Sequence, residues 1–242
     1  MSAKYDALFS GVIGQDYDML NLICPLATKM SHLVGETLKD YATNKTEKLT
    51  VVELGGGTGI TTLALLNASE NTQVLSIDNE PVMQNQAKNN LNAWVESGQL
   101  TFSQNDALTA LQNLPDASVD VVVSAYTLHN FLNTYRTEVI NEIFRVLKTG
   151  GQFINGDRYG LDDISQHTRT IQEEVAGYFQ VLVAEQKLDL LQHWIIHLFN
   201  DESENHVMRE TVALTQLHDA GFVSVHLTHR VAVNALVTAV KP

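Results

Sequence analysis

The chain has 242 residues, of which 44% are hydrophobic and 18% charged, a composition that excludes global disorder and fits one large domain with a packed core. Fifteen basic and 28 acidic residues give a formal net charge of −13, and no cluster of lysine and arginine suggests a phosphate-binding face. The charge balance therefore argues against a nucleic-acid partner and favours a small molecule.

Cysteine content and the N-terminal segment bear on the compartment. Cys24 is the only cysteine, so no internal disulfide can form, which suits a reducing environment. The first nine residues lack the basic start and apolar run of a signal peptide, and no apolar run reaches the roughly 18 residues that a membrane span needs. We therefore expect a cytoplasmic protein with no membrane partner.

Strand and helix patterns alternate from about Lys48 onwards. Pro81 stands where the first turn of a helix tolerates proline, and Gly150-Gly151 is expected to end a helix. Such alternation specifies a parallel sheet with helices on both faces. The expected strands are residues 49–54, 74–77, 100–103, 119–123 and 152–155, and the expected helices are 61–66, 81–95 and 138–147.

The tail has a different pattern. Residues 206–220 predict a helix with Gly221 as its C-cap, and residues 223–230 and 231–240 predict two strands with no room for a helix between them. These strands must form a hairpin, so one of them runs antiparallel to the rest of the sheet. An insertion before the tail is expected to hold two helices, at 164–185 and 188–199.

These patterns predict an α/β fold: a doubly wound, mostly parallel seven-stranded sheet with a C-terminal antiparallel hairpin and a helical cap insertion. We expect a single domain in four parts: an N-terminal helical segment (1–47), the core (48–156), the cap insertion (157–204), and a terminal helix and hairpin (205–242). Both flanks can fold over the C-terminal edge of the sheet, where doubly wound folds bind ligands.

The strongest motif is E-L-G-G-G-T-G at residues 53–59, which follows an apolar strand and precedes a helix. Glycines at such a turn let the backbone approach a ligand closely. The spacing is G-x-G-x-G, whereas a dinucleotide fingerprint is G-x-G-x-x-G, and Ile60 stands at its last position. This departure argues against NAD seated on the helix N-terminus.

Acidic residues follow the next two strands. Asp78 ends the second strand, where a carboxylate can accept hydrogen bonds from two ribose hydroxyls. Asn105-Asp106-Ala107 follows the third strand in the same way, where an acid can reach an adenine amino group. Each acid could also be a helix cap, but the set of three signals favours a nucleoside site.

These motifs carry a resemblance to a known family. Residues 48–156 resemble the class I S-adenosylmethionine (SAM)-dependent methyltransferases: the glycine motif, S-I-D at 76–78, N-D-A at 105–107, the fourth-strand motif at 119–126 and R-V-L-K-T-G-G at 145–151 occur in order. The resemblance implies that SAM is the cofactor. It implies cofactor contacts at Tyr17, Glu53, Gly55, Gly56, Gly57, Gly59, Asp78, Asn79, Asp106, Ala107, Ala125 and Tyr126.

Within that resemblance the residues have separate roles. Gly55 to Gly57 would line the methionine part of SAM, Asp78 and Asn79 would take the ribose, and Tyr17 would close over the cofactor. The chain looks most similar to quinone-biosynthesis methyltransferases and carboxy-SAM synthases. The latter hold an extra carboxylate with an asparagine and an arginine where this chain has Ala125 and Gln216. Those differences favour ordinary SAM.

Methyl transfer from a sulfonium is an in-line displacement, in which aligning donor and acceptor is worth roughly 7–11 kcal/mol. A base is needed only where the acceptor must lose a proton. His129, just after the fourth strand, is the best-placed base. A structural role for this histidine is the alternative.

The insertion supplies the candidate substrate contacts Arg158, Tyr159, His193 and His197. His193 and His197 have a spacing that can bind a metal, but the sole nearby third ligand is Asp189, one turn earlier. We therefore interpret them as buried histidines bonded to backbone and expect no metal. The surrounding helix is apolar nearly all round, so it is buried or packs into a homodimer.

The leading functional prediction is an enzyme that transfers a methyl group from SAM to a small-molecule acceptor. Two alternatives remain open: a carboxy-SAM synthase-like enzyme, and a SAM-binding protein without turnover. An NAD oxidoreductase fits less well because of the glycine spacing.

Overall fold

The computed structural model describes residues 25–242, in which seven strands form one sheet of order β3-β2-β1-β4-β5-β7-β6. The pairings from β3 to β5 are parallel, whereas β7 is antiparallel to both β5 and β6. The expected fold class is thereby confirmed, with β7 as the reversed strand. The strands are β1 Leu49–Leu54, β2 Thr72–Ile77, β3 Leu100–Ser103, β4 Val119–Ala125, β5 Leu147–Arg158, β6 Val223–Val231 and β7 Asn234–Val240.

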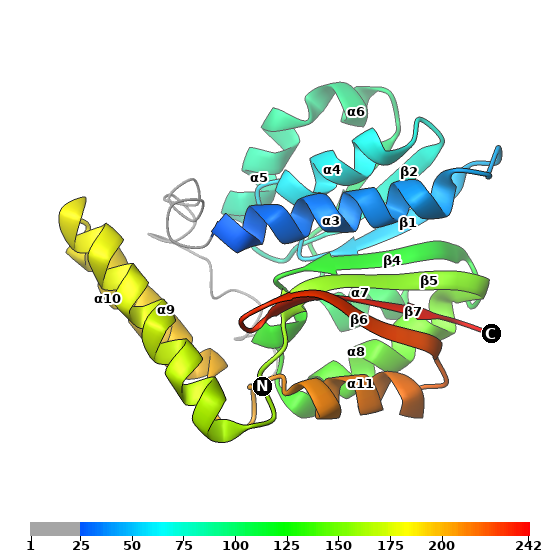
Figure 1. Cartoon of the computed structure of the whole chain (residues 1–242). Coiled ribbons are helices and arrows are strands. Elements are labelled where there is room, and N and C mark those ends of the chain that lie inside the picture. The colour runs from blue at the N-terminus through cyan, green and yellow to red at the C-terminus, as the bar shows by residue number, and fades with distance from the viewer. Residues whose placement is uncertain (1–24) are drawn as a thin grey trace.

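Helices cover both faces of this sheet (Figure 1). On one face lie α3 Pro25–Ala42, α4 Ile60–Ala68, α5 Pro81–Asn90 and α6 Asn92–Glu96. On the other lie α7 Ala107–Gln112, α8 Asn133–Val146 and α11 Glu210–Asp219. A 3₁₀ turn, η1 Leu128–Asn130, follows β4.

Strand β4 shows why the middle of the sheet is stable. Its valines are at most 1% exposed, and they pack alternately into the two core layers: Val122 with the α8 side, and Val121 and Val123 with the α3 side. Burial on both faces is what a near-continuous valine run predicts.

The insertion forms a helical hairpin of α9 Ile164–Ala184 and α10 Leu188–Asp201, which projects at the edge where the parallel strands end (Figure 1). It has a small core of its own, to which Tyr178, Leu182 and Leu190 belong. Phe199 on α10 is 75% exposed. The helix is therefore amphipathic rather than buried all round, and a homodimer stays a prediction.

Some expected boundaries were wrong. The helix expected at 81–95 is broken at Leu91, whose backbone leaves the helical region while its side chain packs into the core. The helix expected at 138–147 begins at Asn133 and ends at Val146. Gly150-Gly151 therefore does not end it but lies within β5, where Gly150 has φ +75°.

The terminal helix begins at Glu210, four residues later than expected. The preceding segment is extended because Gly160 N–H donates to the carbonyl of Met208 and Glu210 N–H donates to the carbonyl of Gly160. This pairing ties the start of the insertion to its end. Among the helices of residues 25–242, none is long and apolar enough to cross a membrane.

Candidate active site

The glycine loop lies between β1 and α4, pressed against the ends of neighbouring strands. Gly55 has φ +72°, and a Cβ there would lie 2.0 Å from Thr127 Oγ1. A Cβ on Gly56 would lie 2.0 Å from Ser76 Oγ. A Cβ on Gly57 would have only one atom of residues 25–242 within 4 Å, Met83 Cε at 3.7 Å, so the outer side of the loop is open there. The loop thus needs glycine on its inner side and offers bare backbone on its outer side.

Asp78 joins this loop to the end of β2. Its Oδ2 accepts the Gly57 N–H at 2.7 Å, and its Oδ1 accepts the Glu80 N–H at 2.8 Å. Burial raises the pKa of Asp78 above its usual value, although the two backbone bonds oppose the shift. Because a carboxylate has about four acceptor positions, Asp78 retains capacity for two further hydroxyl donors.

Glu53 lies fully buried under the loop. The Thr62 hydroxyl donates to Glu53 Oε2 at 2.6 Å. Burial raises the pKa of Glu53 to about 7, while the hydrogen bond from Thr62 works in the opposite direction. The charge at the base of the loop therefore changes near neutral pH.

Replacing Glu53 by glutamine should remove one component of the pH dependence of stability. Between pH 4.5, the ordinary pKa, and about 7, the folded state holds this proton and the unfolded state releases it. Stability from this group therefore falls as pH rises, by roughly 3 kcal/mol at about 1.4 kcal/mol per pKa unit. Urea unfolding at pH 5 and 7.5 should show the wild type losing about 2 kcal/mol of this relative to Glu53→Gln, since each pH lies within half a unit of one pKa; a constant difference would contradict the assignment.

The ends of β2 and β3 are held together beside the loop. The buried Gln84 amide donates to the carbonyls of Asp78 and Ser103. Asp106 caps α7, and its Oδ1 accepts the Thr109 N–H at 3.0 Å and the Tyr135 hydroxyl at 3.0 Å. Burial opposes ionisation of Asp106, but these bonds hold its pKa below the usual value. Ala107, the first residue of α7, is buried.

The backbone after β4 is strained at Tyr126. This residue has φ +51°, which is uncommon for a side chain of its size and is typical of functional sites. Its N–H donates to the carbonyl of Gly156, and its hydroxyl donates to Asn234 Oδ1 at 2.6 Å. Ala125, at the end of β4, pairs with Gly156. These bonds fix the Tyr126 ring.

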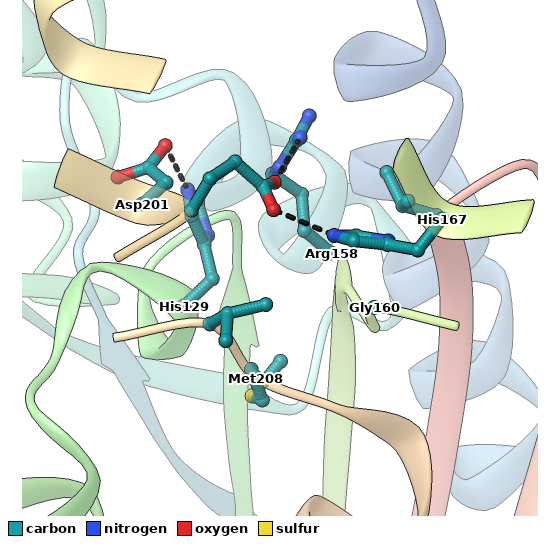
Figure 2. Close-up of a pocket in the computed structure, with 9 residues that line it drawn as sticks. His129, Arg158, Gly160, His167, Asp201 and Met208 are labelled. Carbon is teal, nitrogen blue, oxygen red and sulfur yellow. Dashed lines mark hydrogen bonds and ion pairs between the residues drawn. The ribbon is translucent and has the colours of Figure 1, made fainter. Parts of the chain in front are cut away.

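His129, on η1, lines a buried polar pocket, shown in Figure 2. Its Nδ1 lies 2.6 Å from Asp157 Oδ1, and its Nε2 lies 3.7 Å from Asp201 Oδ2. Burial opposes ionisation of Asp157, but His129 and the Arg158 N–H hold its pKa below the usual value. An imidazole held in this way can accept a proton or bind a metal ion at Nε2.

The other wall of the pocket is an ion-pair network between β5 and the hairpin. Arg158 Nη1 lies 2.6 Å from Glu174 Oε1, and Arg158 Nη2 lies 3.3 Å from Glu202 Oε1. His167 Nε2 lies 2.6 Å from Glu202 Oε2. Figure 2 shows Arg158 and His167 on the side of the pocket opposite His129. The network closes the base of the hairpin onto the sheet.

The structure brings some of the predicted substrate contacts together and separates others. Arg158 lines the pocket, and His197 is buried 3.3 Å from Asp201. Tyr159 is instead part of the main core. His193 is exposed, with Nδ1 2.6 Å from the Asp189 carbonyl oxygen. The predicted cofactor contact Tyr17 lies outside the described residues.

Sequence reasoning missed Asp157 and Asp201. Asp157 stands near the C-terminal end of β5, much as Asp78 directly follows β2. Asp201 lies four residues after His197. The third metal ligand considered from the sequence was instead Asp189, four residues before His193. The position of Asp157 at the end of a strand and the spacing of Asp201 from His197 could each have identified these residues from the sequence.

Residues 51–151 match the family described as a methyltransferase domain. A demethylmenaquinone methyltransferase of Leptospira interrogans is 35% identical over 127 residues, covering 52% of this chain and 48% of that protein. A carboxy-S-adenosyl-L-methionine synthase of Photorhabdus laumondii is 23% identical over 212 residues, covering 85% of this chain and 77% of that protein. The chain spans about half the length of the demethylmenaquinone methyltransferases it matches.

The crystal structure of the CurJ carbon methyltransferase superimposes with a TM-score of 0.66 at 14% identity, over 95% of this chain and 59% of that one. That identity supports the fold alone. Together, the sheet topology, the glycine loop and the family match make residues 51–151 similar to a methyltransferase domain, on a fold shared with solved methyltransferases. The matched residues run from β1 into β5, the part of the chain that holds Gly55, Asp78 and Asp106.

Proposed function

We propose that this protein transfers a methyl group from SAM to a small-molecule acceptor. The observation that carries the proposal is the hydrogen bond between the glycine loop and Asp78. Beside it the outer side of the loop is open at Gly57, and the Asp78 carboxylate keeps unused acceptor positions. Bare backbone beside a ribose-binding acid fits an adenosyl ligand.

The residues around this hydrogen bond fit the remaining parts of SAM. Gly55 and Gly57 would lie along its methionine part, Asp78 would accept the ribose hydroxyls, and Asp106 with Ala107 would lie beside the adenine. The sulfonium of bound SAM supplies an already activated methyl group. The chain therefore has mainly to align the acceptor and exclude water.

We place the acceptor beside the small pocket around His129. This pocket lies at the C-terminal edge of the sheet and is lined by ionisable groups together with the apolar Met208 and Val233. The hairpin of α9 and α10 borders it, which supports the cap role expected for the insertion. His129 as a base for the acceptor's proton stays a prediction, because transfer to carbon or to a neutral amine needs no such base.

A second candidate is carboxylation of the cofactor, favoured by the long match to carboxy-SAM synthases. Against it stand Ala125 and Gln216 at the positions where the resemblance expects an asparagine and an arginine. Gln216 donates to the carbonyl of Asn133 and to the Thr137 hydroxyl, both on α8. Its amide is therefore engaged in packing α11 against α8.

The test is binding followed by product analysis. At 100 times its dissociation constant, SAM should raise the unfolding free energy by about 2.7 kcal/mol, a melting shift of roughly 5–10 °C, and NAD should raise neither. Incubation with methyl-labelled SAM and a small-metabolite pool should then label a metabolite. Label confined to protein or tRNA would refute the small-molecule acceptor, and a carboxylated cofactor with prephenate present would favour the second candidate.

A further inference from the structure

Three buried side chains converge between η1 and the end of α10. His197 Nε2 lies 3.3 Å from Asp201 Oδ2, and His129 Nε2 lies 3.7 Å from the same oxygen. One ligand atom from each residue lies within 4.8 Å of the other two. In tetrahedral zinc sites, bonds of about 2.0–2.1 Å place neighbouring ligand atoms about 3.3 Å apart. The observed separations are close to that spacing.

The first histidine is oriented as a metal ligand would be. His129 Nδ1 is hydrogen-bonded to Asp157 Oδ1, and this bond directs Nε2 toward Asp201. Asp157 is itself fixed, because its Oδ2 accepts the Leu128 N–H at 2.9 Å. Metal-binding histidines almost always pair their second nitrogen with a carboxylate or carbonyl in this way.

Asp201 supplies an independent sign of an unfilled site. Among the described residues its buried Oδ1 has no hydrogen-bond partner, although the residue is only 5% exposed. A buried carboxylate with one oxygen unpartnered is costly, and a cation bound at Oδ2, the oxygen that faces the two histidines, would neutralise the group. Figure 2 shows the Asp201 carboxylate and the His129 ring directed toward each other across the pocket.

The charge balance around the cluster also favours a cation. Four carboxylates, those of Asp157, Asp201, Glu202 and Glu174, belong to the network, and the guanidiniums near them are those of Arg136 and Arg158. With neutral imidazoles this leaves two negative charges in excess among these groups of residues 25–242. A divalent ion at the three converging atoms would balance them.

We propose that His129, His197 and Asp201 bind one divalent transition metal ion of the zinc type. Two imidazoles and one carboxylate suit zinc or cobalt better than magnesium, which prefers oxygen ligands. Three protein ligands leave a fourth position for water or an acceptor oxygen. The site clamps the hairpin to the sheet, and its existence does not depend on methyl transfer.

The experiment uses zinc and cobalt chlorides as probes of the full-length protein. After stripping with a chelator, the wild type should take up one Zn²⁺ per chain by calorimetry and by elemental analysis. Co²⁺ should give the intense visible absorption of a tetrahedral site. His197→Gln and Asp201→Asn should each weaken binding by more than about 100-fold, and Asp157→Asn by about 10–100-fold.

His193→Gln is the matched control, because His193 lies one turn before His197 on α10 and is exposed. This variant should bind zinc like the wild type. Equal loss in His193→Gln and His197→Gln, or no stoichiometric uptake by the wild type, would overturn the proposal. If a variant fails to fold by circular dichroism, the cobalt spectrum of the wild type decides: a tetrahedral spectrum supports the site, and an octahedral one contradicts it.

Discussion

Replacing Asp78 by alanine should weaken SAM binding by roughly 100-fold. Two ribose hydroxyls lose a charged acceptor, and hydrogen bonds to charged groups contribute about 1.5–3 kcal/mol each, where about 1.4 kcal/mol is tenfold in affinity. The loop also loses the bond between Asp78 Oδ2 and the Gly57 N–H. Calorimetric titration of SAM into both proteins measures the difference.

Asp163→Ala is the matched control for this substitution. Asp163 also accepts a neighbouring backbone N–H, that of Gln166, but it does so at the start of α9. Its replacement should cost about 1 kcal/mol of helix stability and leave SAM affinity unchanged. If Asp78→Ala bound SAM as tightly as Asp163→Ala, the nucleoside site would lie elsewhere.

Replacing Arg136 by methionine should lower the unfolding free energy by about 4 kcal/mol, or the melting temperature by about 10 °C. The guanidinium is fully buried and donates to the carbonyls of Leu128, Phe131 and His206. Burial lowers the pKa of Arg136 to about 10, yet leaves it charged at neutral pH. Methionine fills similar space but removes the guanidinium donor from all three carbonyls, and only that of Leu128 keeps another donor among the described residues, the Phe131 N–H.

Arg145→Met on the same helix provides the comparison for Arg136→Met. Arg145 also donates to two carbonyls, those of Leu111 and Leu114, but its side chain is 29% exposed and its partner Asp116 is 80% exposed. Water can replace these bonds, so thermal unfolding should show a loss of about 1 kcal/mol. Equal losses in the two variants would mean that burial of the Arg136 bonds carries no extra stability.

The sheet could be predicted from sequence because its signals are local and repeated. The valines of β4 and the glycines after β1 each determine their own element, and alternation then determines the topology. Boundaries failed where distant packing overrides local preference. Leu91 breaks a predicted helix because the core takes its side chain, and Met208 is extended because it pairs with Gly160 across the insertion.

The candidate site also has a part that the sequence predicted and a part that it did not. Gly55, Asp78 and Asp106 follow consecutive strands, so strand order alone predicted that they share one edge. The pocket around His129 could not be predicted, because Asp201 reaches it from the C-terminal end of a helical hairpin whose packing angle no local pattern encodes.

The reversed strand has a consequence for biosynthesis. β7 lies between β5 and β6, yet it follows β5 in the chain only after the hairpin and α11. While the ribosome makes those helices, β5 presents an unpaired edge, and the apolar residues that Ala235 and Val237 later cover are open to water. Nascent chains that stall between β5 and β7 should therefore be good chaperone clients and prone to aggregate through that edge.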